Sequence, residues 1–197
     1  MEMNAGGAMN VSTLWTWLFW TWMASEIAVA VATRTKRSSG NVRDRGSQLI
    51  LWIVIVASVT GCNWIHAIAP ANMFDGAHWL RPASVTVLAA GLAIRWTAII
   101  TLGKSFSANV AVHESQKVHR TGLYRVVRHP SYLGLLLILV AIGLHSRNWM
   151  SFAVVLLPTT AALLYRIHVE EAALNQALGD EYAAYSRVTK RLVPGVF

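Results

Sequence analysis

Residues 122–134, GLYRVVRHPSYLG, decide how this chain is organised. The stretch begins basic and aromatic and runs directly into the apolar residues 131–144. Pro130 suits the first turn of a helix, because its missing N–H would have no partner there. A helix that starts at Pro130 presents its positive N-terminal end, with Arg128 and His129 beside it, at the edge of an apolar layer. The sequence therefore predicts an anion-receptive corner at this point.

The composition of the whole chain is that of a membrane protein. Of its 197 residues, 55% are hydrophobic, 13% are charged and nine are Trp, which is more apolar than an ordinary soluble domain. A formal net charge of +8 in such a chain is typical of basic loops that flank membrane spans. No basic patch stands on a soluble module, so we expect no nucleic-acid partner. Cys62 is the single cysteine, which excludes an internal disulfide.

Five apolar runs predict a polytopic, all-α membrane helix bundle that forms a single domain over residues 1–197. A span needs about 20 apolar residues, and the runs are 11–33, 47–68, 82–102, 131–144 and 149–165. The fourth run is short, and residues 145–148 separate it from the fifth. We therefore expect these two to form a tight hairpin, with tilt or local thinning of the bilayer. An amphipathic segment that can lie on the membrane surface follows from Val169.

Charged residues assign the helix ends to the two sides of the membrane. The loop 34–46 has five Lys or Arg against one Asp, and 104–129 is also basic, so both should be cytoplasmic. The N-terminus then lies outside and the C-terminus in the cytoplasm. Glu26 and Arg95 fall inside predicted spans, where charge is costly. We expect Glu26 to be satisfied near its helix end or to belong to a site, and Arg95 to snorkel to the cytoplasmic face.

Two polar clusters should meet at the cytoplasmic ends of the hairpin. One is Arg128 with His129, and the other is Arg166 with Glu170 and Glu171. Arg166 and Glu170 share one helix face, so an ordinary intrahelical pair is the simpler interpretation of the second cluster. Because the two clusters end the two arms of one short hairpin, they predict a site that offers both charges beneath an apolar wall. No two histidines have the i, i+4 spacing of a helical metal motif, so we expect no metal.

The order and spacing of these residues form a recognisable pattern. It consists of Gly122-x-Tyr124, Arg128-His-Pro-Ser-Tyr132-x-Gly134, Arg166 with Glu170-Glu171, Gly179-Asp-Glu-Tyr182-x-x-Tyr185 and Arg191-x-x-Pro194. The pattern resembles the isoprenylcysteine carboxyl methyltransferase family and its phospholipid methyltransferase relatives. The resemblance implies a membrane-embedded enzyme that transfers the methyl group of S-adenosylmethionine to an acceptor at the cytoplasmic interface. It places the cofactor site in residues 104–197, and the three N-terminal spans, 1–103, carry no motif of their own.

The resemblance also implies roles for single residues. The residues that would contact the cofactor are His113, His129, Tyr132, Gly134, Glu170 and Glu171. His113 stands where the family usually has Gln. Arg128 and Arg166 would hold the carboxylate of the acceptor, with Tyr124 close to them. A carboxylate is already ionised at neutral pH, so positioning, rather than a strong general base, would perform most of the catalysis, and Arg binds a carboxylate through two hydrogen bonds.

The acceptor and two competing functions stay open at this point. We expect a lipophilic small molecule or a prenylated group that enters from the membrane lipids, with no obligate protein partner. An acidic acceptor is favoured, because two fixed cations repel a protonated amine, although phospholipid amines and small acids or thiols remain alternatives. The competing functions are an NADPH-dependent membrane reductase of the sterol reductase type and a non-enzymatic membrane scaffold or transporter.

Overall fold

The computed structural model describes residues 10–32, 41–42, 46–68, 77–103, 111–112 and 118–195. The predicted all-α fold is confirmed by its five α-helices: α1 (Val11–Ala32), α2 (Ser47–Ile68), α3 (Leu80–Leu102), α4 (Pro130–His145) and α5 (Trp149–Val188). A short 3-10 helix, η3 (Gly122–Arg125), precedes α4. Two-residue strands, β1 (Asn41–Val42) and β2 (Ala111–Val112), pair antiparallel.

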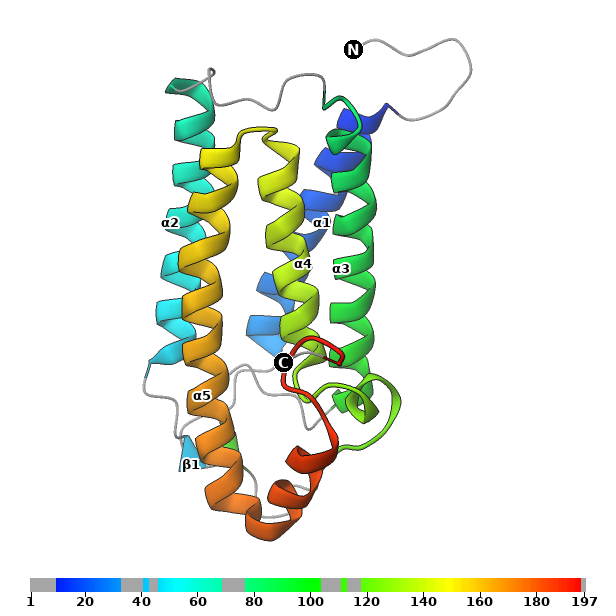
Figure 1. The fold of residues 1–197 in the computed structure, drawn as a ribbon, viewed down its shortest axis with the longest axis vertical. Coiled ribbons are helices and arrows are strands. Elements are labelled where there is room, and N and C mark those ends of the chain that lie inside the picture. Colours follow the sequence, from blue (N-terminus) through cyan, green and yellow to red (C-terminus); the bar gives the residue numbers. More distant parts are fainter. Residues whose placement is uncertain are drawn as a thin grey trace.

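The helices run side by side and alternate in direction (Figure 1). α1, α3 and α5 run from the upper to the lower end of the view, while α2 and α4 return. The most extensive contacts join α3 to α4 and α2 to α5, with further packing of α4 on α5 and of α1 on α3. α4 therefore occupies the interior of the bundle, and its N-terminal end lies at the same end of the bundle as the C-terminal part of α5.

Small residues let α3 and α4 approach closely. A Cβ built on Gly134 would lie 2.7 Å from the backbone N of Arg95 and 2.7 Å from the carbonyl oxygen of Gly91. Next to this contact Leu88, Leu135 and Ile138 are buried, as are the other members of one continuous apolar core. The close approach fixes α4, and hence the site at its N-terminal end, against α3.

The helices differ in their suitability as membrane spans. Within the described residues, three helices are long and apolar enough to cross a bilayer: Ser47–Ile65 of α2, all of α3, and α5. α4 has only 16 residues, or about 24 Å of helix, as the short fourth run indicates. α1 has the length, at 22 residues, but its Ser, Thr and Glu side chains lower its apolar character. The multi-pass membrane architecture follows from these helices.

The predicted hairpin is present, and its second arm is continuous with the amphipathic segment expected from Val169. Asn148 caps α5, since its side-chain oxygen accepts hydrogen bonds from the backbone N–H groups of Met150 and Ser151, both 3.0 Å long. α5 does not end with the apolar run at residue 165 but continues to Val188. Its chain changes direction at Gly179, whose φ of +49° is in the left-handed region that favours glycine. The extension carries the second polar cluster beyond the apolar part of the bundle.

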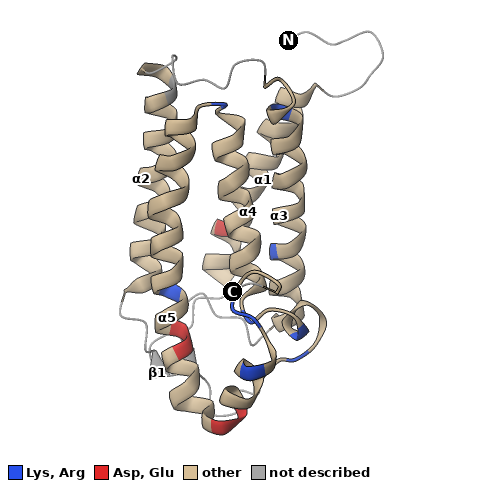
Figure 2. Cartoon of the chain, viewed as in Figure 1, with Lys and Arg blue, Asp and Glu red and all other residues tan. Residues whose placement is uncertain are grey.

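Charged residues gather at the end of the bundle where α4 begins (Figure 2). Most of the blue and red positions on the ribbon lie on the lower part of α5 and on the loops around it, and few interrupt the long apolar helices. The bundle thus has one charged end and one end that is mainly apolar. This polarity agrees with the charge pattern of the sequence.

Candidate functional site

The N-terminal end of α4 is held by a segment from the far end of the chain. Pro130 occupies the first turn of α4, as predicted, and His129 precedes it with extended φ of −123°. Val127 forms a parallel bridge with Lys190. The backbone N–H of Arg128 donates to the carbonyl oxygen of Lys190 over 2.8 Å, and that of His129 donates to the carbonyl oxygen of Arg191 over 3.0 Å. The segment 126–129 and the C-terminal segment 189–192 therefore form one unit.

Glu171 is the centre of the first polar network. Nε of Arg128 donates to its Oε1 over 2.8 Å, and Nε of Arg191 donates to its Oε2 over 2.9 Å. Nε2 of His129 lies 3.4 Å from Oε1, a charge contact without hydrogen-bond geometry. Arg128 also donates from its terminal nitrogen to the carbonyl oxygens of Ser186 (2.8 Å) and Thr189 (2.6 Å). Glu171 and Arg128 together fasten the C-terminal segment to α4 and α5.

The partners of Glu171 keep its carboxylate charged. Burial raises the pKa of Glu171, but the close contact with His129, followed by the hydrogen bond and charge of Arg128, lowers it to about 2. Glu171 lies beyond the roughly 20 residues that α5 needs to cross a bilayer from Trp149, at the charged end of the bundle. The carboxylate is therefore ionised throughout the neutral range.

Tyr132 is the centre of the second polar network, which lies one turn into α4. Its hydroxyl donates to Oε2 of Glu170 over 2.6 Å and accepts from Nε of Arg166 over 3.1 Å. Arg166 also donates to Oγ of Ser47, at the start of α2, over 2.7 Å. The two arms of the hairpin and α2 therefore meet at one hydroxyl group. The prediction that the two polar clusters lie together is confirmed by these contacts and by the Arg128–Glu171 pair.

Tyr124 and Gly134 contact other parts of the protein and hold the helices and loops together. The hydroxyl of Tyr124 donates to the carbonyl oxygen of Ala98 over 3.3 Å, and its own carbonyl accepts from the hydroxyl of Tyr185 over 2.7 Å. Tyr124 is buried, and Gly134 faces α3 across the close contact described above. Their implied parts in acceptor and cofactor binding stay predictions, and His113 lies outside the described residues.

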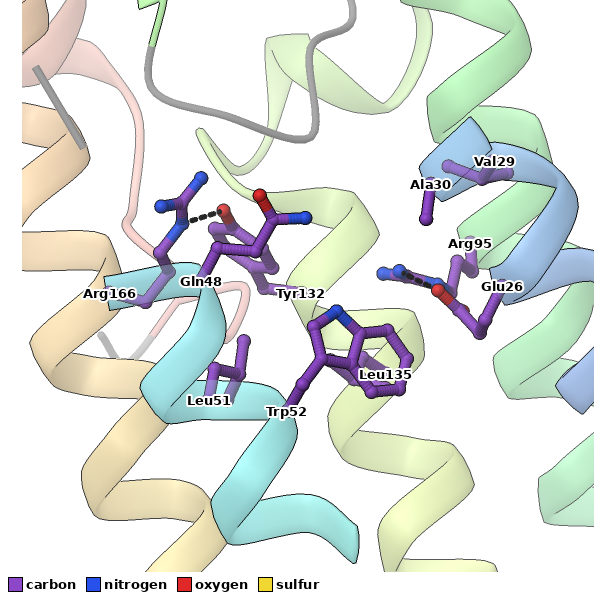
Figure 3. A pocket seen from close by; sticks show the side chains of 10 residues that line it. All are labelled: Glu26, Val29, Ala30, Gln48, Leu51, Trp52, Arg95, Tyr132, Leu135 and Arg166. Atoms are coloured by element: carbon purple, nitrogen blue, oxygen red, sulfur yellow. Dashed lines mark hydrogen bonds and ion pairs between the residues drawn. The ribbon is translucent and has the colours of Figure 1, made fainter. Parts of the chain in front are cut away.

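A small cavity opens beside Tyr132 and Arg166 (Figure 3). It has a volume of about 50 Å³, and side chains from all five helices line it: Glu26, Val29, Ala30, Gln48, Leu51, Trp52, Arg95, Tyr132, Leu135 and Arg166. Glu26 and Arg95 form an ion pair on the wall opposite Arg166. The expectation that Arg95 snorkels to the cytoplasmic face is wrong: Arg95 is 6% exposed and Glu26 is 5% exposed, because each neutralises the other inside the bundle.

The sequence interpretation missed the contribution of the N-terminal helices to this cavity. Glu26 and Arg95 are 69 residues apart, and Ser47 and Arg166 are 119 residues apart. Two opposite charges in separate predicted spans were the available signal, since each is too costly to bury alone. Ser47 and Trp52 gave no signal, because a polar residue at a helix start and a Trp near an interface are both ordinary.

Two buried polar atoms near Glu171 have no hydrogen-bond partner within the described residues. They are Nε2 of His129 and the hydroxyl oxygen of Tyr182, and both side chains are about 95% buried. Buried polar groups nearly always have partners, so these two atoms have hydrogen-bonding capacity that the described residues do not use. The described residues contain no group of three metal-ligating side chains.

Comparison with known proteins shows which family the central part of this chain resembles. A model of the isoprenylcysteine carboxyl methyltransferase family matches residues 84–176. The structure is similar to that of a eukaryotic intramembrane Ras methyltransferase of this family, with a TM-score of 0.61, 25% sequence identity, and coverage of 73% of this chain and 52% of that one. The similarity to the isoprenylcysteine carboxyl methyltransferase family therefore covers residues 84–176, which are just under half of the chain.

Two curated relatives differ in how much of the chain they match. Protein-S-isoprenylcysteine O-methyltransferase B of Arabidopsis thaliana is 35% identical over 123 residues, which cover 60% of this chain and 61% of that protein. Methanethiol S-methyltransferase 2 of Bradyrhizobium diazoefficiens is 30% identical over 184 residues, which cover 91% of this chain and 55% of that protein. The chain spans about three-fifths or less of the length of these relatives.

The region matched by the isoprenylcysteine carboxyl methyltransferase family contains both polar networks. Residues 84–176 include Arg95, Tyr132 and Arg166, as well as the acidic pair Glu170 and Glu171. The matched residues do not include α1, α2 or the C-terminal segment whose carbonyl oxygens accept hydrogen bonds from Arg128. The family match therefore covers the hairpin and most of α3, but not α1 and α2, which supply the remaining cavity walls.

Proposed function

We propose that this chain is an S-adenosylmethionine-dependent methyltransferase that acts at the membrane interface on a lipophilic acceptor with a small anionic head, most simply a prenylcysteine-like carboxylate. The observation that carries the proposal is the Tyr132 network, which joins Glu170 and Arg166 beside a cavity in a chain whose residues 84–176 match a methyltransferase family. The carboxylate of Glu170 and the guanidinium of Arg166 both bind the Tyr132 hydroxyl. A site with one acidic and one basic group suits a reaction in which a cofactor and an anionic acceptor meet.

The residues at the charged end fit the cofactor. When bound, S-adenosylmethionine supplies a methyl group on a positively charged sulfur. The unpartnered Nε2 of His129 and hydroxyl of Tyr182 offer hydrogen bonds to its polar groups, and the carboxylate of Glu170 can accept from ribose hydroxyls. Both oxygens of Glu171 already accept from arginines, so Glu171 would act on the cofactor mainly through its charge and through the position of His129.

Arg166 is the residue best placed to hold an anionic acceptor. It lines the cavity, and its hydrogen bonds to Tyr132 and Ser47 fix the orientation of the guanidinium. Fixed orientation is what a displacement reaction needs, because most of its acceleration comes from aligning the reacting atoms. Arg128 has a different set of partners, in Glu171 and the C-terminal segment, so its part in acceptor binding rests on the family resemblance alone.

A small thiol is the second candidate acceptor. It is favoured by one observation: the similarity to the methanethiol S-methyltransferase extends over 91% of this chain, whereas the similarity to the Arabidopsis prenylcysteine enzyme covers 60%. The extra length includes helices that line the cavity. A thiol must lose its proton before it can react, and a cationic cavity stabilises the thiolate.

The charged end of the bundle is proposed to face the cytoplasm. Its support is the basic character of residues 34–46 and 104–129, which connect the helix ends that lie there, because basic loops stay on the cytoplasmic side. The acceptor would then enter from the lipid and the cofactor from the cytoplasm.

Titration calorimetry on the detergent-purified chain tests the cofactor assignment directly. We expect saturable binding of S-adenosylhomocysteine and none of NADPH. Glu170→Gln should weaken S-adenosylhomocysteine binding by about tenfold, as expected for the loss of a charge-assisted hydrogen bond, while Glu181→Gln, an exposed carboxylate on the same helix, should leave it unchanged. Binding of NADPH alone would favour the reductase, and binding of neither would favour the scaffold or transporter.

A further inference from the structure

The ion pair between Glu26 and Arg95 brings two charges from the N-terminal half into the cavity beside Tyr132 and Arg166 (Figure 3). Glu26 lies on α1 and Arg95 on α3. Their side chains are almost fully buried, and the indole N–H of Trp22 also donates to Oε1 of Glu26 over 3.1 Å. An ion pair in this position adds little to stability compared with apolar side chains of the same size, so its presence points to another role.

Arg95 has hydrogen-bonding capacity left over. Its Nε and one terminal nitrogen donate to the Glu26 carboxylate, the latter over 2.6 Å. Its other terminal nitrogen donates to the carbonyl oxygen of Ser131 over 3.0 Å. These bonds use three of the five N–H groups of a guanidinium. Among the described residues, the two remaining N–H groups have no partner, and Figure 3 shows the end of the side chain directed into the cavity.

Arg128, the other arginine implied for acceptor binding, is placed differently. Its three hydrogen bonds go to Glu171, Ser186 and Thr189, and it is not among the residues that line this cavity. The arginine that shares the cavity with Arg166 is Arg95.

We propose that Arg95, held in place by Glu26, is the second acceptor-binding arginine of the site and faces Arg166 across the cavity. The inference rests on the proposed function and specifies which residues bind the acceptor. The ligand is a small anionic head group, a carboxylate or a thiolate, because a cavity of about 50 Å³ holds only a few heavy atoms. Any apolar remainder of the acceptor extends into the membrane.

Charge supports an anionic head group. Glu26 neutralises Arg95, which makes the burial of both tolerable, and Arg166 leaves the cavity with a net positive charge. A carboxylate or thiolate entering between the two guanidinium groups gains hydrogen bonds from both sides, whereas a protonated amine is repelled. The Ser131 contact ties Arg95 to the first turn of α4, so the acceptor would be fixed relative to Tyr132.

The test compares four variants in methyl-transfer kinetics with two probes, N-acetyl-S-farnesyl-L-cysteine and methanethiol. Arg95→Lys keeps the charge but loses the planar fork of donors, and Glu26→Gln/Arg95→Met removes the pair without leaving a buried unpaired charge. Glu26→Gln frees the Arg95 guanidinium, and Arg81→Met, an exposed arginine on the same helix, is the control. Melting temperature and S-adenosylhomocysteine affinity are measured for each variant.

We expect the acceptor KM of the active probe to rise about tenfold or more in the two Arg95 variants, with S-adenosylhomocysteine affinity within about twofold of the unaltered chain. Glu26→Gln should also raise that KM, because Arg95 loses the carboxylate that holds it in place, and Arg81→Met should change nothing. An unchanged KM in both Arg95 variants overturns the inference, and so does a parallel loss of cofactor affinity or folding, which would make the pair structural. If the unaltered chain binds no S-adenosylhomocysteine, or methylates neither probe, the proposed function itself fails first.

Discussion

Glu171 shows how much of the site depends on a single side chain. Replacing it with Gln removes the charge that Arg128 and Arg191 both contact, and leaves the buried Arg128 without its ionic partner. We expect the free energy of unfolding to fall by about 3 kcal/mol, the lower end of the range for a broken buried pair, because the Arg191 side chain is 46% exposed. Thermal unfolding of Glu171→Gln in detergent measures this, with the exposed Glu181→Gln as control.

The pH dependence of the same variant gives an independent check. The pKa of Glu171 is lowered to about 2 from an ordinary value of 4.5, so its carboxylate stabilises the fold fully above pH 4.5 and loses that effect as the pH falls through 2. The difference in stability between the unaltered chain and Glu171→Gln should therefore shrink over this interval. Equal melting temperatures at pH 7 would show that the contacts around Glu171 contribute no stability.

At the residue level, the sequence predicted the contacts that follow from one hairpin. His129, Tyr132, Arg166 and the acidic pair end the arms of that hairpin, so their meeting required only the positions of two helices. The Glu26–Arg95 and Ser47–Arg166 contacts depend on how four helices pack, which no local pattern in the sequence specifies. The catalytic and binding roles of all these residues stay predictions.

Among the elements, the contact of α3 with α4 is the most sensitive to a single methyl group. The Cβ of Gly134→Ala would lie 2.7 Å from the Cβ and backbone N of Arg95 and from the carbonyl oxygen of Gly91, so the helices must separate. Overpacking of this kind costs about 1–3 kcal/mol, and the shift would displace Arg95 from the cavity. We expect a lower melting temperature and a lower kcat/KM.

Gly61→Ala is the matched control for this change. Its Cβ would meet only the side-chain methyl of Val154, at 3.3 Å, and alanine favours a helix over glycine by up to about 1 kcal/mol. The control should be as stable as the unaltered chain or more stable. If Gly134→Ala behaves like Gly61→Ala, the close approach of α3 and α4 does not constrain the site.

The sequence predicted the positions of the helices better than the length of α5. Hydrophobic runs located all five helices, because burial in a bilayer requires apolar length. They did not indicate that α5 would continue from residue 165 to Val188. Its later part contacts the segments 118–128 and 189–192, and the amphipathic pattern from Val169 did not show that it would be continuous with the fifth apolar run.

For the whole molecule, the alternating directions of the helices predict that the two ends of the bundle lie on opposite sides of the membrane. Ser12, at the start of α1, and Asp180, after the bend in α5, are both exposed and belong to opposite ends. In a Cys62→Ala background, Ser12→Cys should react with a membrane-impermeant maleimide on intact cells, and Asp180→Cys only after permeabilisation. The reverse pattern would overturn the cytoplasmic placement of the charged end but keep the bundle. Reaction of both cysteines from the same side would contradict the helix arrangement itself, because an odd number of crossings from Ser12 to Asp180 must separate them.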